Sequence, residues 1–221
     1  MGASKSGMAW EQTRTDVIAD NIANVNTDGF QRKVAVGKEF GEMLLRRLGD
    51  KRTDGPSVGS LGSGAVVDQI VTDERQPSIL ITERGLDVAL EGPGQFTYQT
   101  ANGPAYTRDG RFQRDASGQL VTAKGETVLV NGAPVGQGAT SLTIGADGVV
   151  SLDGQEAGRL DIQGATADTR VRPGALEASN VDLAQEMTDL ITALRAFQIN
   201  QRALQVQDQT LAKAVNDLAN L

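Results

Sequence analysis

The residues of this chain best able to do chemistry are its carboxylates, which form two close pairs. Asp73 and Glu74 are neighbours, and Asp16 and Asp20 are one helical turn apart. A carboxylate pair acts as general acid and base only where the surroundings push the two pKa values apart. In a chain of net charge −7, solvated surface is the simpler interpretation of both pairs. Ser78 is a possible nucleophile, but nothing in the sequence places a Lys beside it.

The composition removes most other chemistry. The chain has no Cys and no His, so it lacks disulfides, thiolates and the commonest general base and metal ligand. Gly59–Gly64 lacks the Gly-Lys-Ser/Thr ending of a phosphate-binding loop. We therefore expect no enzyme, no cofactor, no metal and no small-molecule substrate. With a pI of about 4.7, nucleic acid is also an unsuitable partner.

The C-terminal region carries a long apolar seam. We expect one helix over 176–221, capped by Ser179 or Asn180. Only Gln201 and Asp208 interrupt the spacing of three and four, which runs for about five heptads, as in a coiled coil. Ile191, Ile199 and Val206 widen the seam. Its apolar members are Leu183, Met187, Leu190, Leu194, Phe197, Leu204, Leu211, Val215 and Leu218.

This helix is much longer than the average of about 11 or 12 residues in globular proteins. The length favours partners outside the chain's own domain, although an ordinary amphipathic helix lying on that domain is the alternative. The N-terminal region predicts a shorter helix of the same kind over 8–25. Met8, Thr15, Ile18, Ile22 and Val25 follow the same spacing of three and four, and Trp10 and Val17 lie to one side of them. Its end is marked by Asn24, Asn26, Asp28 and Gly29, and Phe30 offers an apolar anchor.

The middle of the chain alternates between polar and apolar residues and is punctuated by turn pairs. These pairs are Asn102-Gly103, Asp109-Gly110, Ser117-Gly118, Lys124-Gly125, Asn131-Gly132, Asp147-Gly148 and Asp153-Gly154. We expect short strands at 65–72, 78–82, 86–90, 95–99, 105–107, 111–114, 119–122, 126–130, 141–144, 149–152 and 158–163. Such regular short strands are typical of an antiparallel sandwich or barrel-like domain. Phe96, Tyr98, Tyr106 and Phe112 are expected in its core and rim.

The expected fold class is α+β, with long terminal helices pairing as a coiled-coil-like unit around an inserted antiparallel all-β domain. Residues 1–30 form the N-terminal assembly helix and 31–64 a connector, with a short helix at 39–48 and a flexible linker at 49–64. Residues 65–172 form the β domain. Residues 173–221 form the C-terminal assembly helix, which packs with 1–30 and with neighbouring copies. The chain has only 4% aromatic residues, so much of its burial should come from neighbours.

Four blocks resemble the bacterial flagellar rod and hook family. DVIADNIANVNTDGF, at 16–30, is similar to the family's N-terminal signature, with Asp20 in place of an Asn. LDVAL, at 86–90, and YTRDGRFQRDASGQLV, at 106–121, resemble two internal blocks. Residues 175–197 resemble the C-terminal signature. The departures, Pro93 with Gln95 and Gln76-Pro77-Ser78, are local.

The resemblance implies a structural subunit of the basal-body rod that self-assembles into a helical tube. In that family, terminal helices surround an export channel, β domains form the outer layer, and the tube transmits motor torque. It also implies other axial proteins, and possible outer-ring proteins, as partners, and type III export into the periplasm without a cleaved signal peptide. Asp16 and Asp20 agree with the absence of a secretory signal. The size favours a larger rod subunit, proximal or distal, and the N-terminal block resembles the distal one more closely.

Three alternatives remain: a hook-type axial protein of the same family, a secreted binding or adhesive module with a coiled-coil stalk, and a glycan-cleaving enzyme fused to rod elements. The assembly interface expected in the rod comprises Ile18, Ile22, Asn24, Val25, Asn26 and Phe30, together with the apolar seam. Isolated helices with an uncovered seam recover little of their ordering entropy. We therefore expect the ends of a free monomer to be largely disordered and to fold on assembly.

Overall fold

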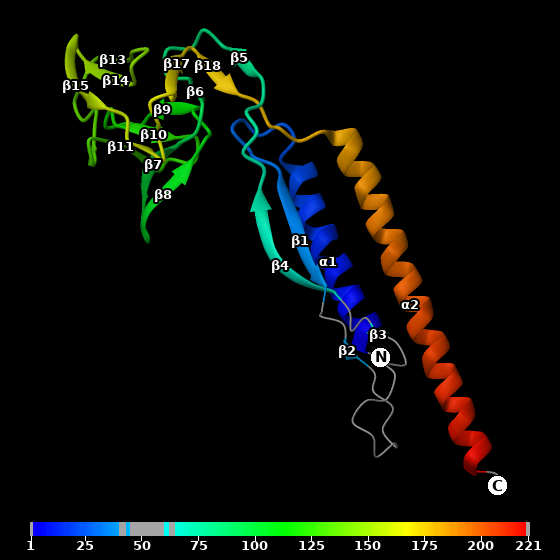
Figure 1. The fold of residues 1–221 in the computed structure, drawn as a ribbon. Coiled ribbons are helices and arrows are strands. Elements are labelled where there is room, and N and C mark those ends of the chain that lie inside the picture. The colour runs from blue at the N-terminus through cyan, green and yellow to red at the C-terminus, as the bar shows by residue number, and fades with distance from the viewer. Residues whose placement is uncertain (1, 40–42, 45–59, 62–64, 220–221) are drawn as a thin grey trace. The chain divides into compact units, whose positions relative to one another are not determined.

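The computed structural model describes residues 2–39, 43–44, 60–61 and 65–219. Two compact units result, each made of segments distant in the sequence (Figure 1). Unit 1 comprises residues 1–22, 33–72 and 182–221, and unit 2 comprises 23–32 and 73–181. An N-terminal helix, many antiparallel strands and a C-terminal helix confirm the α+β class.

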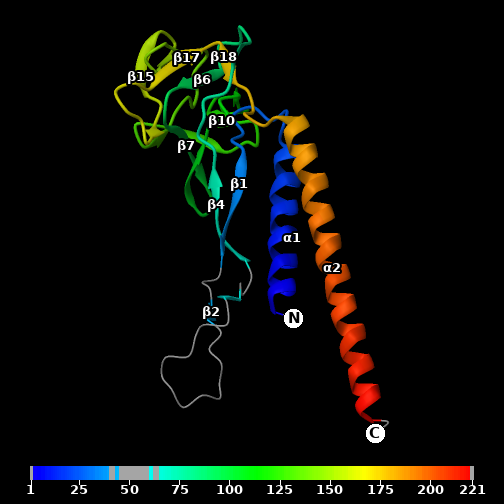
Figure 2. The ribbon, with the colours of Figure 1, turned by 45° about the vertical axis from the view of Figure 1, so that its right-hand side comes forward.

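Unit 1 contains two helices and two short ribbons. Helix α1 spans Gly2–Ala23 and helix α2 spans Leu183–Ala219. They lie side by side and run in opposite directions, as Figures 1 and 2 both show. Strand β1 (Lys33–Glu39) pairs antiparallel with β4 (Ala65–Thr72), with a register shift between Val36 and Gly37. Strands β2 (Met43–Leu44) and β3 (Ser60–Leu61) form the second ribbon.

Helix α2 begins later than the sequence predicts. Its start is capped by Asp182, whose Oδ1 accepts hydrogen bonds from the amides of Ala184 (2.9 Å) and Gln185 (3.2 Å). The predicted start near 176 is wrong because Ala175–Glu177 forms strand β18. Its backbone bonds are satisfied by a partner strand rather than by a helix. Helix α1 starts and ends earlier than the predicted 8–25.

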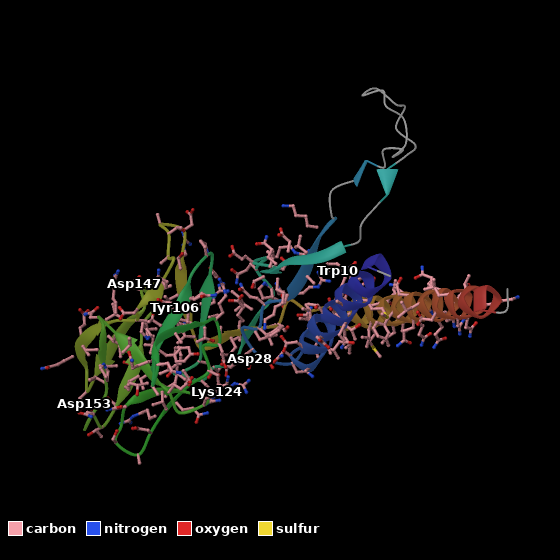
Figure 3. The ribbon with its side chains drawn as sticks, turned by 90° about the horizontal axis from the view of Figure 1, so that it is seen from below. Trp10, Asp28, Tyr106, Lys124, Asp147 and Asp153 are labelled. Carbon is pink, nitrogen blue, oxygen red and sulfur yellow. The ribbon has the colours of Figure 1, made fainter. Side chains whose placement is uncertain are left out.

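The connector also differs from its expected form. Strand β1 occupies Lys33–Glu39, and β2 lies within the predicted short helix at 39–48, so that helix is wrong in its described part. The absence of a side chain at Gly37 lets β1 lie close to Trp10 of α1. A Cβ atom there would be 2.9 Å from Cη2 of Trp10, which projects from α1 in Figure 3. Apart from β3, the predicted linker at 49–64 lies outside the described residues.

Unit 2 is antiparallel throughout its described pairs. The largest sheet has seven strands, with β16-β7-β11-β10-β9 as its main order, β8 beside β7 and β12 beside β11. These strands are β7 (Gln95–Thr100), β8 (Gly103–Thr107), β9 (Phe112–Arg114), β10 (Leu120–Thr122), β11 (Thr127–Val130), β12 (Ala133–Pro134) and β16 (Ile162–Gln163). A second sheet joins β13 (Leu142–Ile144), β14 (Val149–Leu152) and β15 (Gln155–Arg159).

Two further ribbons in unit 2 join segments far apart in the sequence. Strand β6 (Val88–Glu91) pairs with β17 (Arg170–Pro173), and β5 (Ile79–Ile81) pairs with β18. Strands β17 and β18 were not predicted, because Pro and Gly, here Pro173 and Gly174, usually interrupt regular structure. In the structure Pro173 ends a strand, and Gly174 takes a positive φ of 71° between the two. The single strand predicted at 158–163 is also wrong, because β15 and β16 join different sheets there.

One apolar core holds unit 2 together. Phe96 and Phe112 meet edge to face, with ring centroids 5.1 Å apart and planes at 77°. Both rings are buried, whereas Tyr98 is half-buried and Tyr106 is exposed, so the core-and-rim prediction is confirmed. The other core members are Val88, Leu90, Leu120, Val128, Val130, Leu142, Ile144, Val150, Leu160 and Val171.

We predict that Gly110→Ala destabilises unit 2 by about 3 kcal/mol, because its Cβ would overlap the Val88 carbonyl oxygen, whose neighbours are tightly packed. The φ angle of Gly110 is not positive, so the substitution tests the close approach of two backbone segments and not a left-handed conformation. Gly85→Ala is the matched control, since its Cβ would meet nothing within 4 Å. Urea unfolding midpoints measure both, and equal midpoints would contradict this account.

A second prediction concerns pH. Hydrogen bonds from the side chain of Ser117, and then from the backbone of Gln119 and Ser117, lower the pKa of Asp115 below 3.8. The stability that this carboxylate contributes is therefore present above pH 3.8 and is lost as pH falls through the lower folded pKa. The stability gap between the parent and Asp115→Ala should shrink over that range in urea unfolding. A gap that stays constant as pH falls would argue against the turn's role.

Candidate assembly interface

The antiparallel helices α1 and α2 of unit 1 keep a constant register. Asn21 on α1 reaches Glu186 on α2, with Nδ2 3.1 Å from Oε2. Fourteen residues away on each helix, Gly7 lies beside Asn200, whose Nδ2 would be 3.2 Å from a Cβ on that glycine. Between them, Arg14 forms a 3.8 Å ion pair with Asp189. The helices therefore stay adjacent over about four turns.

The amide of Asn21 joins three elements. Its Oδ1 accepts a hydrogen bond from the Lys33 amide (2.9 Å), and its Nδ2 donates to the Lys33 carbonyl (2.8 Å) and to Glu186. Strand β1 begins at Lys33, so this side chain connects β1 with both helices. Asn21 and Glu186 are both buried. A buried polar group that is hydrogen-bonded costs little, and it penalises any other register of the three elements.

The predicted seam on α2 divides into two sides. Leu190, Phe197 and Leu204 are half-buried, and they share their side of the helix with fully buried Glu186 and Ala193. Leu183, Met187 and Leu194 face solvent instead, and together with Ile191 they form what we call the outer strip. Exposed fractions in the outer strip are 42% for Leu183, 54% for Met187, 52% for Ile191 and 44% for Leu194.

The last part of α2 extends past the N-terminal end of α1, as Figures 1 and 2 show. The helices have 37 and 22 residues. Leu211 is 51% exposed, although its angular position matches the half-buried side. Val206 and Leu211 also line a shallow hollow with Gln207 and Thr210. The side chains of Val215 and Leu218 lie outside the described residues.

The N-terminal interface candidates are not collected on one surface. Ile18 is buried and Ile22 is half-buried within unit 1. The other four, Asn24, Val25, Asn26 and Phe30, belong to unit 2, where the chain turns rather than continuing as a helix. Asn24 organises this turn, since its carbonyl accepts from the Thr27 amide (3.1 Å) and its Oδ1 from the Thr27 hydroxyl (3.2 Å).

Apolar periodicity did not identify Asn21, Glu186 and Ala193 as contacts. Two of them are polar and one is small, so none adds to an apolar pattern. One signal in the sequence was available for Asn21. It is a polar residue one helical turn from Val17 and Ile18, which are both buried. Lys33 and Asp20 add an ion pair of 2.8 Å between β1 and α1.

The described residues include no cluster of three or more His, Cys, Asp or Glu residues that could hold a metal ion. None of the helices among the described residues is long and apolar enough to cross a membrane. What the arrangement does present is an apolar surface on a long helix. Such a surface mediates association rather than chemistry.

Comparison with known proteins agrees with this geometry. Three family models match in chain order: "Flagella basal body rod protein" over 1–31, "Flagellar hook protein FlgE/F/G D1 domain" over 89–152, and "Flagellar basal body rod FlgEFG protein C-terminal" over 172–218. The first covers all of α1 and the following turn, and the last covers α2 up to residue 218.

Relatives that match over nearly the whole chain are also flagellar rod proteins. Flagellar basal-body rod protein FlgG of Bacillus subtilis is 34% identical over 96% of each chain. FlgG of Caulobacter vibrioides is 33% identical over 93% of this chain and 94% of its own. Flagellar basal-body rod protein FlgF of Rhizobium meliloti is 33% identical, over 98% of this chain and 95% of its own. The chain therefore belongs to the flagellar basal-body rod protein family, and it is a structural subunit of the flagellum rather than an enzyme.

Proposed function

We propose that this rod subunit builds a helical tube by burying the outer strip of α2 against neighbouring copies and other axial proteins. The observation that carries the proposal is the outer strip itself, four large apolar side chains between 42% and 54% exposed on one side of a single helix. Full burial of such a side chain is worth about 1.5–3 kcal/mol, so completing four half-covered ones contributes several kcal/mol per subunit.

The helices need this contribution. Ordering a residue's backbone costs about 1–2 kcal/mol, and α1 with α2 comprises 22 and 37 residues. Their mutual contact covers only one side of α2 and ends before the helix does. We propose that the two helices complete a coiled-coil-like unit in the tube, and that a free monomer leaves its ends largely unfolded.

In this tube, residues 1–30 and 173–221 would be the assembly regions around an export channel. The β domain, expected over 65–172, would form the outer layer, and the interlocked helices would pass motor torque along the rod. We place the subunit in the periplasmic part of the basal body, exported without a cleaved signal peptide, with outer-ring proteins as possible neighbours. A distal rather than a proximal position rests on the N-terminal resemblance.

A hook-type axial role is the second candidate, because the matched D1 model carries the name of a hook protein. The two candidates differ in where the chain resides. Immunogold labelling of isolated hook–basal bodies with an antibody against the β domain separates them. Label on the rod supports the first proposal, and label on the hook supports the second.

We predict that Leu194→Asp prevents incorporation into the rod while unit 2 remains folded, because a charge would be buried between helices without a partner. Thr192→Asp is the matched control, since it puts the same charge on an exposed position of α2 outside the outer strip. The measurements are the amount of chain in purified basal bodies and the thermal unfolding of the free protein. Normal motility of the Leu194→Asp strain would refute the role assigned to the outer strip.

We also predict weak amide protection in the helices of dilute monomer. Amides of Leu190 and Leu204 should exchange far faster than those of Leu120 and Val128 in the core of unit 2, since local opening costs less where few apolar contacts break. Hydrogen exchange read by mass spectrometry on the full chain measures this. Strong protection at both α2 positions at every dilution would contradict folding on assembly.

A further inference from the structure

Three connecting segments of unit 2 meet at one side chain, that of Asn180. The chain passes from unit 2 to unit 1 after Arg32 and after Val181, and it returns at Asp73. Arg32, Asp73 and Asn180 are therefore at, or next to, three of the points where the chain changes unit. They are 107 or more residues apart in two of the three pairings, so only the fold brings them together.

The hydrogen bonds of Asn180 join all three segments. Its Oδ1 accepts from the Arg32 amide at 2.6 Å, and its Nδ2 donates to the carbonyls of Asp73 at 2.8 Å and Arg75 at 3.2 Å. Its backbone amide lies 3.4 Å from the Phe30 carbonyl oxygen. The Asp73 amide in turn donates to the Arg32 carbonyl at 2.8 Å. We call this set the Asn180 clamp.

The sequence suggests a simpler role for Asn180, as the cap of α2, but the structure assigns that role elsewhere. Asp182 accepts the bonds from the first helical amides, so helix initiation does not use the Asn180 side chain. Both ends of its amide serve the connecting segments instead. An Asp would keep the acceptor and lose the donor, and an Ala would lose both.

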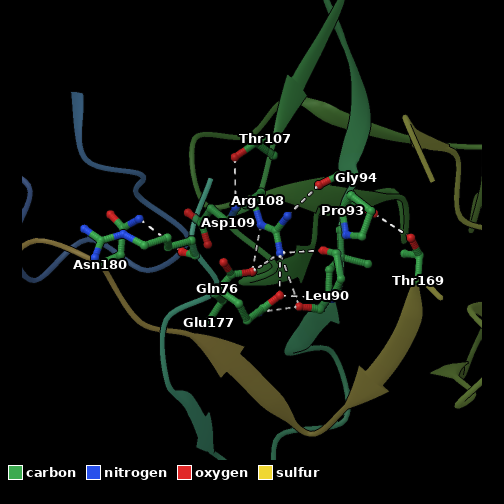
Figure 4. Close-up of polar contacts among 12 residues, drawn as sticks. Gln76, Leu90, Pro93, Gly94, Thr107, Arg108, Asp109, Thr169, Glu177 and Asn180 are labelled. Carbon is green, nitrogen blue, oxygen red and sulfur yellow. Dashed lines mark hydrogen bonds and ion pairs between the residues drawn. The ribbon is translucent and has the colours of Figure 1, made fainter. Parts of the chain in front are cut away.

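A buried ion pair fixes the clamp to the β domain. Nε of Arg108 donates to Oε2 of Glu177 at 2.8 Å, and both side chains are almost fully buried. The same guanidinium donates to the carbonyls of Gly94 and Gly92, each at 3.0 Å (Figure 4). The Glu177 carbonyl accepts from the Gly29 amide at 2.7 Å, which secures the turn that precedes Phe30.

Gly29 is required at this point for two reasons. Its φ is +67°, and a Cβ would overlap the backbone of Arg108. The turn from 23 to 32 is therefore held by Arg108 and Glu177 on one side and by Asn180 on the other. All of these residues belong to unit 2.

We infer that Asn180 is the positioning residue that gathers the segments leading out of the β domain, so that a load entering one of them is shared by all three. This deepens the proposed function, on which it rests, because a rod subunit must pass torque between its assembly helices and its β domain. Without the clamp, each segment would be a separate tether able to straighten on its own.

The first test is hydrogen exchange on the full chain. Asn180→Ala should raise the exchange rate of the Arg32 amide by roughly fivefold to tenfold, the effect expected on losing one hydrogen bond. Asn180→Asp keeps the acceptor and should restore slow exchange at Arg32. Asn102→Ala, at an exposed hairpin position, is the control and should change nothing at Arg32. Unchanged Arg32 exchange in Asn180→Ala would overturn the inference.

The second test measures torque. Cells carrying Asn180→Ala in place of the parent chain should lose a larger fraction of their rotation speed than the parent as the viscosity of the medium rises. Absence of the variant from basal bodies, with unchanged thermal unfolding of the β domain, would also support a positioning role. Incorporation with the parent's viscosity dependence would overturn the inference. If the parent chain itself were missing from basal bodies, the proposed function would fail, and the exchange test would still decide the role of Asn180.

Discussion

The structure depends on one imbalance, which is that α2 carries more apolar surface than its own chain covers. Helix α1 has 22 residues against 37 in α2, and it contacts only one side. The outer strip and Leu211 are left facing solvent at a cost that association would remove. This imbalance is the physical ground for the proposed assembly, because α2 has two apolar sides and its own chain covers only one of them.

Polar groups decide where the apolar surfaces go. Apolar contacts are non-directional, so a helix seam by itself permits several registers. Asn21 restricts α1, β1 and α2 to one register through its bonds to Lys33 and Glu186. Asn180 does the same for the connecting segments within unit 2. Each uses the donor and acceptor of one carboxamide, a group that offers both in a fixed geometry.

Several elements were predictable because their signals are local. Strands such as β10 and β14 lie close to their hairpin partners, and glycines with positive φ, such as Gly118 and Gly148, mark the turns beside them. Strands β17 and β18 were missed because Pro173 and Gly174 interrupt the local pattern, and the partner strands that order them lie 79 or more residues earlier in the chain. Gly110 resembled its neighbours in sequence, yet it serves close backbone approach instead of a left-handed turn.

The sequence alone determined that this chain has apolar terminal helices, an antiparallel β region between them and the motifs of an axial protein, because periodicity and turn residues act over a few neighbouring positions. Only the tertiary structure decided which side of α2 is covered, where that helix begins, and which asparagines hold distant segments together. The reason is that burial and long-range hydrogen bonds depend on which segments meet in space. Leu190 and Leu194 have the same side chain and share one seam, but only Leu190 is on the side that α1 reaches.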